Sequence, residues 1–320
     1  MGKYSLRRNG GRILVCLGIL ILAVILLPGC GAFDKREACY PVTRVSVILP
    51  HNDDGYWSLI QEGIEEAQAE LGNQYGIDIQ IHIPQLNYNI SQMTDILKQQ
   101  VAAQVDIIAV QGNEDAQFRR VLEDARRQGI QVICVDTEIE DFPYDLYIGT
   151  DNYAAGKLMG KNLAELTGGK AKVAVISGEE GYSNLEQRLT GLCEELSKYP
   201  GIEVTGVSYN HYDGLTFMEL YHRLGGEADV LACIEGTGGQ TLSHTFAGKD
   251  PAYSCVVGFD AYTGVKSQVL AGVVKQDTNQ MGRRLVEEIA NYVVKGSYSS
   301  NRIYTDTCWL TAGNYDEVMR

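Results

Sequence analysis

Residues 45–83 read VSVILPHNDDGYWSLIQEGIEEAQAELGNQYGIDIQIHI, which we interpret as a strand–helix–strand unit. The apolar run at 45–49 is typical of a strand that is buried on both faces. Between residues 57 and 71, apolar side chains recur at helical spacing. At 77–83, Ile alternates with polar residues, which predicts a second strand. Strands that alternate with amphipathic helices indicate a parallel sheet with both faces covered.

The same alternation continues along the rest of the chain. Further strands are expected at 107–110, 132–135, 146–149, 173–176, 202–207, 230–234 and 255–258. Further helices are expected at 93–101, 118–125, 154–166, 185–196, 215–224, 240–247 and 281–294, followed by a last extended segment at 303–310. The pattern restarts after residue 149, so we predict an α/β protein of two Rossmann-like lobes. Each lobe would hold a parallel sheet with helices on both faces.

Length and charge exclude several classes of protein. The chain has 320 residues, enough for two domains of ordinary size, and 45% of them are hydrophobic. It carries 27 Lys and Arg against 41 Asp and Glu, a net charge of -14. Such an acidic chain repels a phosphate backbone, so we expect no nucleic-acid partner.

Residues 1–29 have the organisation of an export signal. Four basic residues precede an apolar stretch at 13–27, which is short for a membrane-spanning helix. The motif LPGC that ends at Cys30 resembles the bacterial lipoprotein cleavage box, in which the cysteine becomes the lipidated N-terminus. We expect a signal peptide over 1–29, lipidation at Cys30 and a polar spacer over 30–42. The protein would then be exported and lipid-anchored to the outer face of the bacterial cytoplasmic membrane; the alternative is an uncleaved anchor.

The other cysteines and the histidines indicate no metal or cofactor site. Six cysteines follow Cys30, namely Cys39, Cys134, Cys193, Cys233, Cys255 and Cys308. They form no CxxC motif, and the five histidines show no metal-ligand spacing. Cys134, Cys233 and Cys255 lie in apolar runs, where a thiol is usually a small core residue. The sequence leaves the disulfide pairing open.

Polar side chains follow most of the expected strands. Because ligands bind beyond the carboxyl ends of strands in an open parallel sheet, these side chains are candidates for a binding cleft. Each has a structural alternative. Asp136 and Asp260 could close turns, Trp57 could be a core residue, Asn184 could cap a helix and Arg188 could form a structural ion pair.

Enzyme signatures are weak. The glycine-rich segment 236–239 follows a strand and could cradle a phosphate, but Glu235 beside it disfavours an anion. No nucleophile elbow of the GxSxG type occurs. We therefore expect a protein that is not an enzyme.

Five segments carry a resemblance to a known family: 52–57, 135–136, 148–152, 257–260 and 276–277. In this order and spacing, the chain from about residue 43 to 311 resembles the type I periplasmic sugar-binding proteins of the ribose-binding group. The resemblance implies two lobes joined by a three-segment hinge that closes over a ligand. The N-terminal lobe would comprise 43–149 with 277–306, and the C-terminal lobe 150–276 with 307–320.

The resemblance also implies roles for individual residues. The implied ligand contacts are Asp54, Tyr56, Trp57, Asp136, Thr137, Glu186, Arg188, Tyr212, Glu235, Asp260 and Gln276, and the implied hinge residues are Asp151, Asn152 and Asp277. Ribose binders of the family carry Arg at the positions of Thr137 and Glu186, and Asn at that of Glu235. Since Thr cannot replace a bidentate Arg, ribose is not the expected ligand. Another sugar, a polyol, an amino sugar or a cationic small molecule fits better.

Together these observations predict a monomeric, lipid-anchored solute-binding protein that delivers a sugar to the permease of an ABC importer. Two alternatives belong to other classes. The same fold could signal to a membrane sensor kinase, or the chain could be an extracytoplasmic Rossmann-like enzyme, although it lacks a cofactor fingerprint.

Overall fold

The computed structural model describes residues 40–51, 55–246 and 252–319. The expected signal peptide, Cys30, Cys39 and Asp54 lie outside these ranges. Within the described ranges, no helix has both the length and the apolar character needed to cross a membrane.

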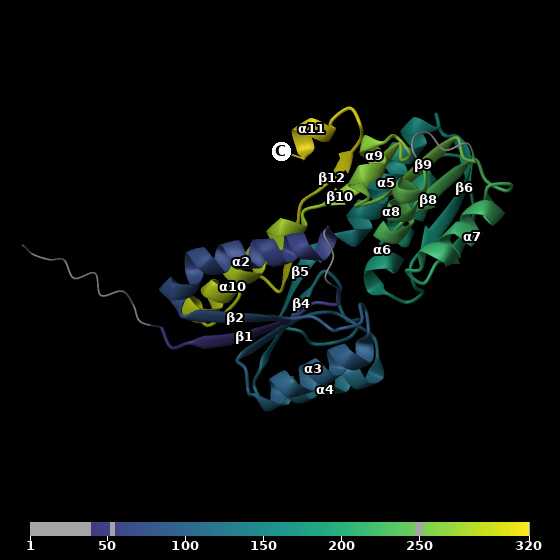
Figure 1. Cartoon of the computed structure of the whole chain (residues 1–320). Coiled ribbons are helices and arrows are strands. Elements are labelled where there is room, and N and C mark those ends of the chain that lie inside the picture. Colours follow the sequence, from purple (N-terminus) through teal and green to yellow (C-terminus); the bar gives the residue numbers. More distant parts are fainter. Residues whose placement is uncertain (1–39, 52–54, 247–251, 320) are drawn as a thin grey trace, which may run out of the picture. The chain divides into compact units, whose positions relative to one another are not determined.

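The first lobe is built on a parallel six-stranded sheet in the order β11-β5-β4-β3-β1-β2. Its strands are β1 (Thr43–Ile48), β2 (Ile77–His82), β3 (Ile107–Gln111), β4 (Gln131–Val135), β5 (Leu146–Thr150) and β11 (Arg302–Thr305). Helices α2 (Tyr56–Tyr75) and α10 (Thr278–Lys295) cover one face, and α3 (Ile90–Ala102) and α4 (Ala116–Arg127) cover the other (Figure 1).

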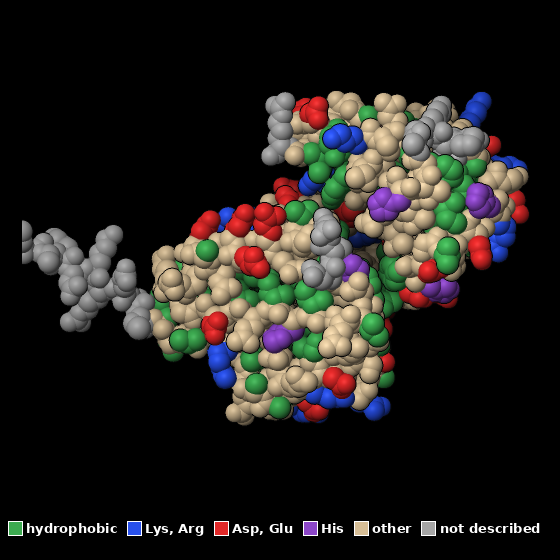
Figure 2. Space-filling model, in the orientation of Figure 1, with side chains coloured by type: hydrophobic (Ala, Val, Ile, Leu, Met, Phe, Trp, Pro, Cys, Tyr) green, Lys and Arg blue, Asp and Glu red, His purple; other side chains and the backbone are tan. Residues whose placement is uncertain are grey.

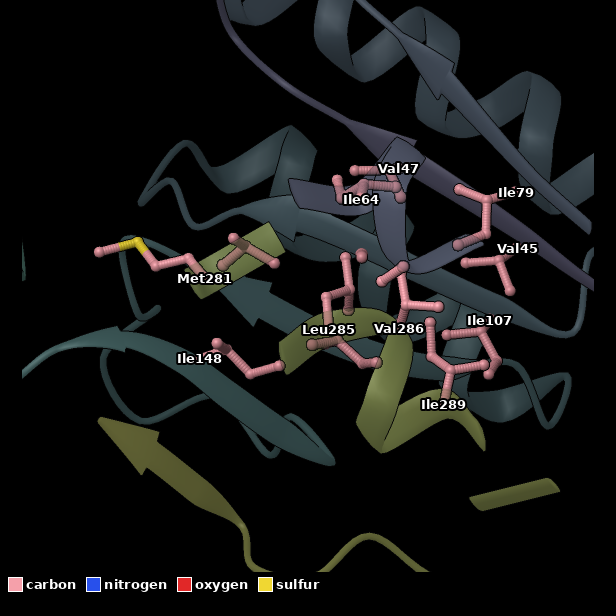
Figure 3. Close-up of a cluster of buried hydrophobic side chains, with 14 of the residues drawn as sticks. Val45, Val47, Ile64, Ile79, Ile107, Ile148, Met281, Leu285, Val286 and Ile289 are labelled. Atoms are coloured by element: carbon pink, nitrogen blue, oxygen red, sulfur yellow. The ribbon is translucent and has the colours of Figure 1, made fainter. Parts of the chain in front are cut away.

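Successive residues of each strand supply the two faces of this sheet. In β3, Ile107 packs toward α2 and α10, whereas Ile108 packs toward α3 and α4. Figure 3 shows the first of these clusters, in which Leu285 and Ile289 of α10 lie among valines and isoleucines of the strands. Burial on both faces explains why the strands read as continuous apolar runs in the sequence.

The second lobe repeats the arrangement. Its sheet has the order β12-β10-β9-β8-β6-β7, and only the edge strand β12 is antiparallel to its neighbour. The strands are β6 (Lys170–Ser177), β7 (Gly201–Tyr209), β8 (Val230–Cys233), β9 (Cys255–Phe259), β10 (Gly272–Gln276) and β12 (Thr307–Leu310). Helices α5 (Asn152–Leu166) and α6 (Ser183–Leu196) cover one face. The other face packs against α7 (Gly214–Leu224), α8 (Gly236–Thr245), α9 (Tyr262–Lys266) and the short α11 (Tyr315–Val318). The predicted fold class is confirmed.

The chain passes between the two sheets three times: from β5 to α5, from β10 to α10, and from β11 to β12. The single extended segment expected at 303–310 is therefore two strands, which separate at Asp306 and join different sheets. Periodicity could not reveal this change, because both strands are extended and only their partners differ. The backbone N–H of Asp277 donates to the carbonyl of Asp306 at 3.0 Å, which ties two of the crossings together.

Glycines bring one pair of helices into close contact in each lobe. A Cβ on Gly63 or Gly282 would lie 2.0 Å from a backbone oxygen of the partner helix, where α2 crosses α10. Gly156 and Gly191 have the same role where α5 crosses α6, with backbone oxygens at 2.1 and 2.2 Å. In the second pair, the oxygen that faces Gly156 belongs to Arg188. The helix crossing therefore sets the backbone position of a predicted site residue.

Two of the three strand cysteines are core residues, as predicted. Cys134 and Cys233 have no exposed surface, and burial raises the pKa of both thiols. Cys255 differs because it is the first residue of β9 and is only partly buried.

Acidic side chains are prominent on the surface. On the face shown in Figure 2, Asp and Glu gather over α2. The exposed glutamates of that helix are Glu62, Glu65, Glu66 and Glu70. The Arg283 guanidinium donates to Glu70 at 2.9 Å and holds the pKa of that carboxyl below its ordinary value.

Candidate functional site

A cavity of about 440 Å³ lies where strand ends of the two sheets meet. Its lining comes from the segments after β1, β2, β3 and β4 in the first lobe, and after β7, β8, β9 and β10 in the second, together with α6. This is the edge at which parallel sheets bind ligands. The volume is within the range of small-molecule sites.

Eight of the predicted contacts line this cavity: Tyr56, Trp57, Asp136, Arg188, Tyr212, Glu235, Asp260 and Gln276. Thr137 and Glu186 do not, and Asp54 lies outside the described residues. The cavity also includes residues outside the set of predicted contacts, namely His51, Asn87, Tyr88, Gln111, Asn184, Leu185, Gly236, Thr237 and Gln240. His51 and Gln111 lie at the ends of strands, where the strand-end rule expects polar side chains. The loop residues Asn87 and Tyr88 have no periodic signal.

Asp136 is held in place from several sides. It follows β4 with φ of +68°, a left-handed conformation that Asp adopts more readily than most residues. The Tyr56 hydroxyl donates to its Oδ1, and the Thr137 hydroxyl donates to its Oδ2 at 2.7 Å. Gln111 Nε2 lies 3.4 Å from the same Oδ2. Thr137, which is 1% exposed, therefore acts on the cavity through Asp136.

Asp260 occupies the corresponding place in the second lobe. It follows β9, also with positive φ, at +50°. The backbone N–H of Gln276 and the Tyr262 hydroxyl each donate to its Oδ1 at 2.9 Å. Gln276 Nε2 donates to the other carboxylate oxygen. Burial raises the pKa of Asp260, although the hydrogen bonds from Gln276 and the charge of Arg188 oppose this effect.

Gln276 connects groups from the two lobes. Its Oε1 accepts hydrogen bonds from the Thr150 hydroxyl at 2.7 Å and from Arg188 Nη2 at 2.9 Å, and the Tyr56 hydroxyl lies 3.3 Å away. Thr150 ends β5 and Tyr56 begins α2, both in the first lobe. Gln276 ends β10, one residue before the chain crosses, so its amide lies at the junction.

Arg188 is anchored by neutral groups. Its Nε donates to Asn152 Oδ1 at 2.8 Å, and its Nη1 donates to the carbonyl of Ile234 at 3.1 Å. The guanidinium lies over the Phe259 ring, 4.2 Å from its centroid, and the residue is 4% exposed. Among the described residues, no carboxylate lies within ion-pair distance of it, so the structural ion pair considered from the sequence is not present.

Glu235 accepts hydrogen bonds at the start of α8. Its carboxylate accepts from the backbone N–H groups of Thr237 and Gly238, and its Oε1 accepts from Asn210 Nδ2 at 2.8 Å. The helix therefore begins at Gly236, earlier than the predicted residue 240. A phosphate would bind to these same backbone N–H groups, but the Glu235 carboxylate already accepts their hydrogen bonds. The structure therefore contradicts a phosphate-binding role for the segment 236–239.

Aromatic rings form another part of the wall. The Tyr88 and Tyr212 rings stack, with centroids 5.6 Å apart and 5° between their planes. Trp57 Nε1 donates to the Tyr88 hydroxyl at 2.8 Å. Trp57 is 3% exposed and belongs to the core cluster shared by α2 and α10, yet it also lines the cavity. The core interpretation of Trp57 is therefore confirmed, and contact with a ligand stays a prediction.

The sequence-based role of Asn184 was wrong. Helix α6 begins at Ser183 after Tyr182, and the side chain of Asn184 accepts from the backbone of Leu185 rather than capping the helix. Asn184 instead lines the cavity.

The predicted hinge residues lie at two of the three crossings. Asp151 caps α5 by accepting from the backbone of Ala154 at 2.9 Å, and Asp277 caps α10 by accepting from Gln280 at 3.1 Å. Asn152 links its own crossing to the cavity through its bond to Arg188.

Glu186 lines a second cavity of about 520 Å³, together with Glu138, Tyr144, Arg302 and others. There the Arg302 guanidinium forms an ion pair with Glu138 and donates a hydrogen bond to the Tyr144 hydroxyl at 2.8 Å. The Ser183 hydroxyl donates to the carbonyl of Glu138 at 3.1 Å, a contact between the lobes. Among the residues that the structure describes, no group of His, Cys, Asp and Glu side chains is arranged to hold a metal ion.

Comparisons with known proteins agree with this geometry. A family model described as a periplasmic binding protein domain matches residues 45–297. The ribose import binding protein RbsB of Bacillus subtilis is 24% identical over 293 residues, which cover 87% of this chain and 92% of that protein.

Solved structures share the fold. The glucose-galactose binding protein GanP of Geobacillus stearothermophilus superposes with a TM-score of 0.76 at 24% identity, covering 85% of this chain and 98% of that one. An ABC transporter solute-binding protein from Burkholderia graminis, in complex with D-arabinose, gives a TM-score of 0.76 at 23% identity and covers 86% and 97% of the two chains.

Proposed function

The chain belongs to the periplasmic binding protein family, and on that premise we propose that it captures a monosaccharide or a related polyol in the 440 Å³ cavity and delivers it to an ABC importer. Relatives in the comparisons carry names that refer to ribose import and to sugar complexes. Those names describe the relatives, whereas the proposal for this chain rests on its own cavity.

The observation that carries the proposal is the combination of polar acceptors and aromatic faces in one cavity. Asp136, which is 5% exposed, and the half-buried Asp260 offer carboxylate oxygens, which accept hydrogen bonds from hydroxyl groups strongly once water is excluded. The rings of Tyr56, Trp57 and Tyr212 offer apolar faces for the C–H surfaces of a sugar. Neither feature alone selects a sugar, but together they match a molecule with polar edges and apolar faces.

Capture would proceed by hinge closure. Lobes of 43–149 with 277–306 and of 150–276 with 307–320 would rotate about the crossings near Asp151, Asn152 and Asp277. Contacts between the lobes support this proposal: Asn113 Nδ2 donates to the Tyr182 hydroxyl at 3.0 Å, and Tyr88 stacks on Tyr212. These contacts would form when the lobes close and would be lost when they open.

The remaining parts of the proposal concern location and partners. We propose export through a signal peptide at 1–29, lipid anchoring at Cys30 to the outer face of the cytoplasmic membrane, and action as a monomer. The closed form would be the state that the permease recognises. No catalytic role is proposed.

A thermal-shift screen of the purified protein against monosaccharides and polyols tests the proposal. A ligand present at one hundred times its dissociation constant should raise the free energy of unfolding by about 2.7 kcal/mol. A shift with one or a few sugars, followed by calorimetric titration to one site, is the expected result. A cooperatively unfolding protein that no sugar or polyol stabilises would contradict the proposal.

A further inference from the structure

The cavity carries an excess of negative charge. Its lining includes three carboxylates, Asp136, Glu235 and Asp260, and among the described lining residues Arg188 is the only Lys or Arg. Asp136, Glu235 and Arg188 are at most 5% exposed, and Asp260 is half-buried. His51 is the remaining basic side chain of the lining, and its ring contacts Tyr88.

Arg188 uses three of its five N–H groups on protein partners. Its three nitrogens donate to Asn152, the carbonyl of Ile234 and Gln276, and its face lies on Phe259. These partners are neutral. The hydrogen bonds that hold the guanidinium therefore include no ion pair with a carboxylate.

The three carboxylates are likewise held by neutral donors. Asp136 accepts from hydroxyl groups and an amide, Glu235 from backbone N–H groups and an amide, and Asp260 from an amide, a backbone N–H and a hydroxyl. Such bonds fix the orientation of a carboxylate but leave its charge in place. Buried charge that is not offset by an opposite charge is costly.

Carboxylates from the two lobes act on the same part of the cavity. Burial raises the pKa of the Tyr212 hydroxyl, and the charges of Glu235 and Asp136 add to this effect. Glu235 belongs to the second lobe and Asp136 to the first, so carboxylates of both lobes act on the Tyr212 hydroxyl in the aromatic wall. Burial is the main cause of the raised pKa of Asp260, and the charge of Arg188 opposes it.

We propose that the ligand of this cavity is a cationic monosaccharide, a sugar that carries a free amino group. The inference rests on the proposed sugar-binding function and narrows its ligand class. The ammonium group offsets part of the charge of the three carboxylates, which pair with no Lys, Arg or His among the described residues, while the hydroxyl groups and ring faces use the contacts already described. An anionic sugar, such as a uronate or a sugar phosphate, is disfavoured by the same charges.

Calorimetric titration with matched sugars tests this inference. Each series contains a neutral hexose, its 2-amino-2-deoxy derivative and the N-acetyl form of that amine, in the gluco, galacto and manno configurations. The N-acetyl form keeps the added bulk but not the charge. We expect at least one free amine to bind more than about tenfold tighter than both neutral members of its series.

Two variants assign the preference to the carboxylates. Glu235→Gln removes one charge and retains an acceptor for Gly238 and Asn210, although its amide nitrogen then faces the N–H of Thr237. Asp136→Asn removes one charge in the first lobe. Each should reduce the preference for the amine by about tenfold or more, while the affinity for the neutral hexose changes less. The control Glu203→Gln removes a carboxylate from the exposed surface of β7 and should leave the preference unchanged.

The outcomes distinguish failure of the charge inference from failure of the sugar-binding proposal. A neutral hexose that binds as tightly as its amine overturns the charge inference and leaves the sugar-binding function standing. Binding of no member of any series, by a protein that unfolds cooperatively, overturns both. An amine preference that survives in both Glu235→Gln and Asp136→Asn also overturns the inference, because the charge would then not be its cause.

Discussion

The rings of Tyr88 and Tyr212 stack across the two lobes, with centroids 5.6 Å apart and their planes within 5° of parallel. Tyr88 follows β2 and Tyr212 follows β7, and each of these strands is the edge strand next to the first strand of its sheet. Both tyrosines have positive φ, +56° and +54°. Equivalent turns of the two lobes therefore bring one ring each to the same side of the cavity, and contact between the rings would accompany closure.

Removing one ring should favour the open state. Tyr88→Ala loses the stacking with Tyr212, worth about 0.5–1.5 kcal/mol, and the hydroxyl that accepts from Trp57. We expect ligand affinity to fall roughly tenfold with a small change in stability, since Tyr88 is 44% exposed. Titration calorimetry measures the affinity, urea unfolding measures the stability, and small-angle scattering of the liganded protein reports the shift toward the open state. Tyr40→Ala removes a ring that packs on Tyr75 and serves as the control; equal losses in both variants would rule out a specific contact.

Trp57 should affect both stability and binding. Its side chain is 3% exposed within a core cluster and also lines the cavity. For Trp57→Ala we expect a destabilisation of about 3 kcal/mol in urea unfolding as well as the loss of ligand binding. Trp57→Phe retains much of the packing and removes the hydrogen bond to Tyr88, so it should cost about 1 kcal/mol. A fully stable Trp57→Ala protein would place this residue outside the core.

Asp260→Asn should weaken ligand binding by more than tenfold, about 1.4 kcal/mol. The carboxylate accepts from both the backbone and the side chain of Gln276, and an amide nitrogen in place of one oxygen would oppose a donor. The position of Gln276 would then shift relative to Arg188 and Thr150. Affinity that is unchanged in titration calorimetry would show that Asp260 lies outside the contact set.

The same variant reports on the titration of Asp260. Burial raises the pKa of this carboxyl above its ordinary value of 3.8, so the folded protein binds the proton more tightly than the unfolded chain. The resulting stabilisation is complete below the unfolded pKa and is lost as the pH rises through the folded value. The free energy of unfolding of the wild type, relative to that of Asp260→Asn, should therefore fall as the pH increases through this window. A difference that stays constant in urea titrations across this range would contradict the shift.

Membrane attachment has a direct test. Cys30→Ser removes the residue proposed for lipidation, and the protein should move from the membrane fraction to the soluble extracytoplasmic fraction, because two or more acyl chains are needed for stable anchoring. Immunoblotting of the two fractions measures the change. Retention of the variant in the membrane would show that the leader remains as an uncleaved anchor.

Local patterns in the sequence were sufficient for most helices and strands, because both faces of each sheet are covered and the strands are continuously apolar. The strand-end rule likewise brought Asp136, Glu235 and Asp260 to one cavity. What it could not supply depends on contacts between distant segments. The start of α8 at Gly236 depends on the Glu235 side chain, and the separation of β11 from β12 depends on their partner strands. Tyr88 was missed because it lies in a loop without periodicity.

The crossing of α5 and α6 should control both stability and the site. In Gly156→Ala, the new Cβ would lie 2.1 Å from the backbone oxygen of Arg188, a distance that requires the helices to separate. We expect a destabilisation of about 3 kcal/mol in urea unfolding, because backbone cannot move aside as a flexible side chain does. The displacement of Arg188 should also weaken its bonds to Asn152 and Gln276, and thereby ligand binding. Gly206→Ala is the matched control, since a Cβ there meets nothing within 4 Å and should change stability by less than about 0.5 kcal/mol. If the two variants were equally stable and bound ligand equally well, the close crossing would not be what positions Arg188.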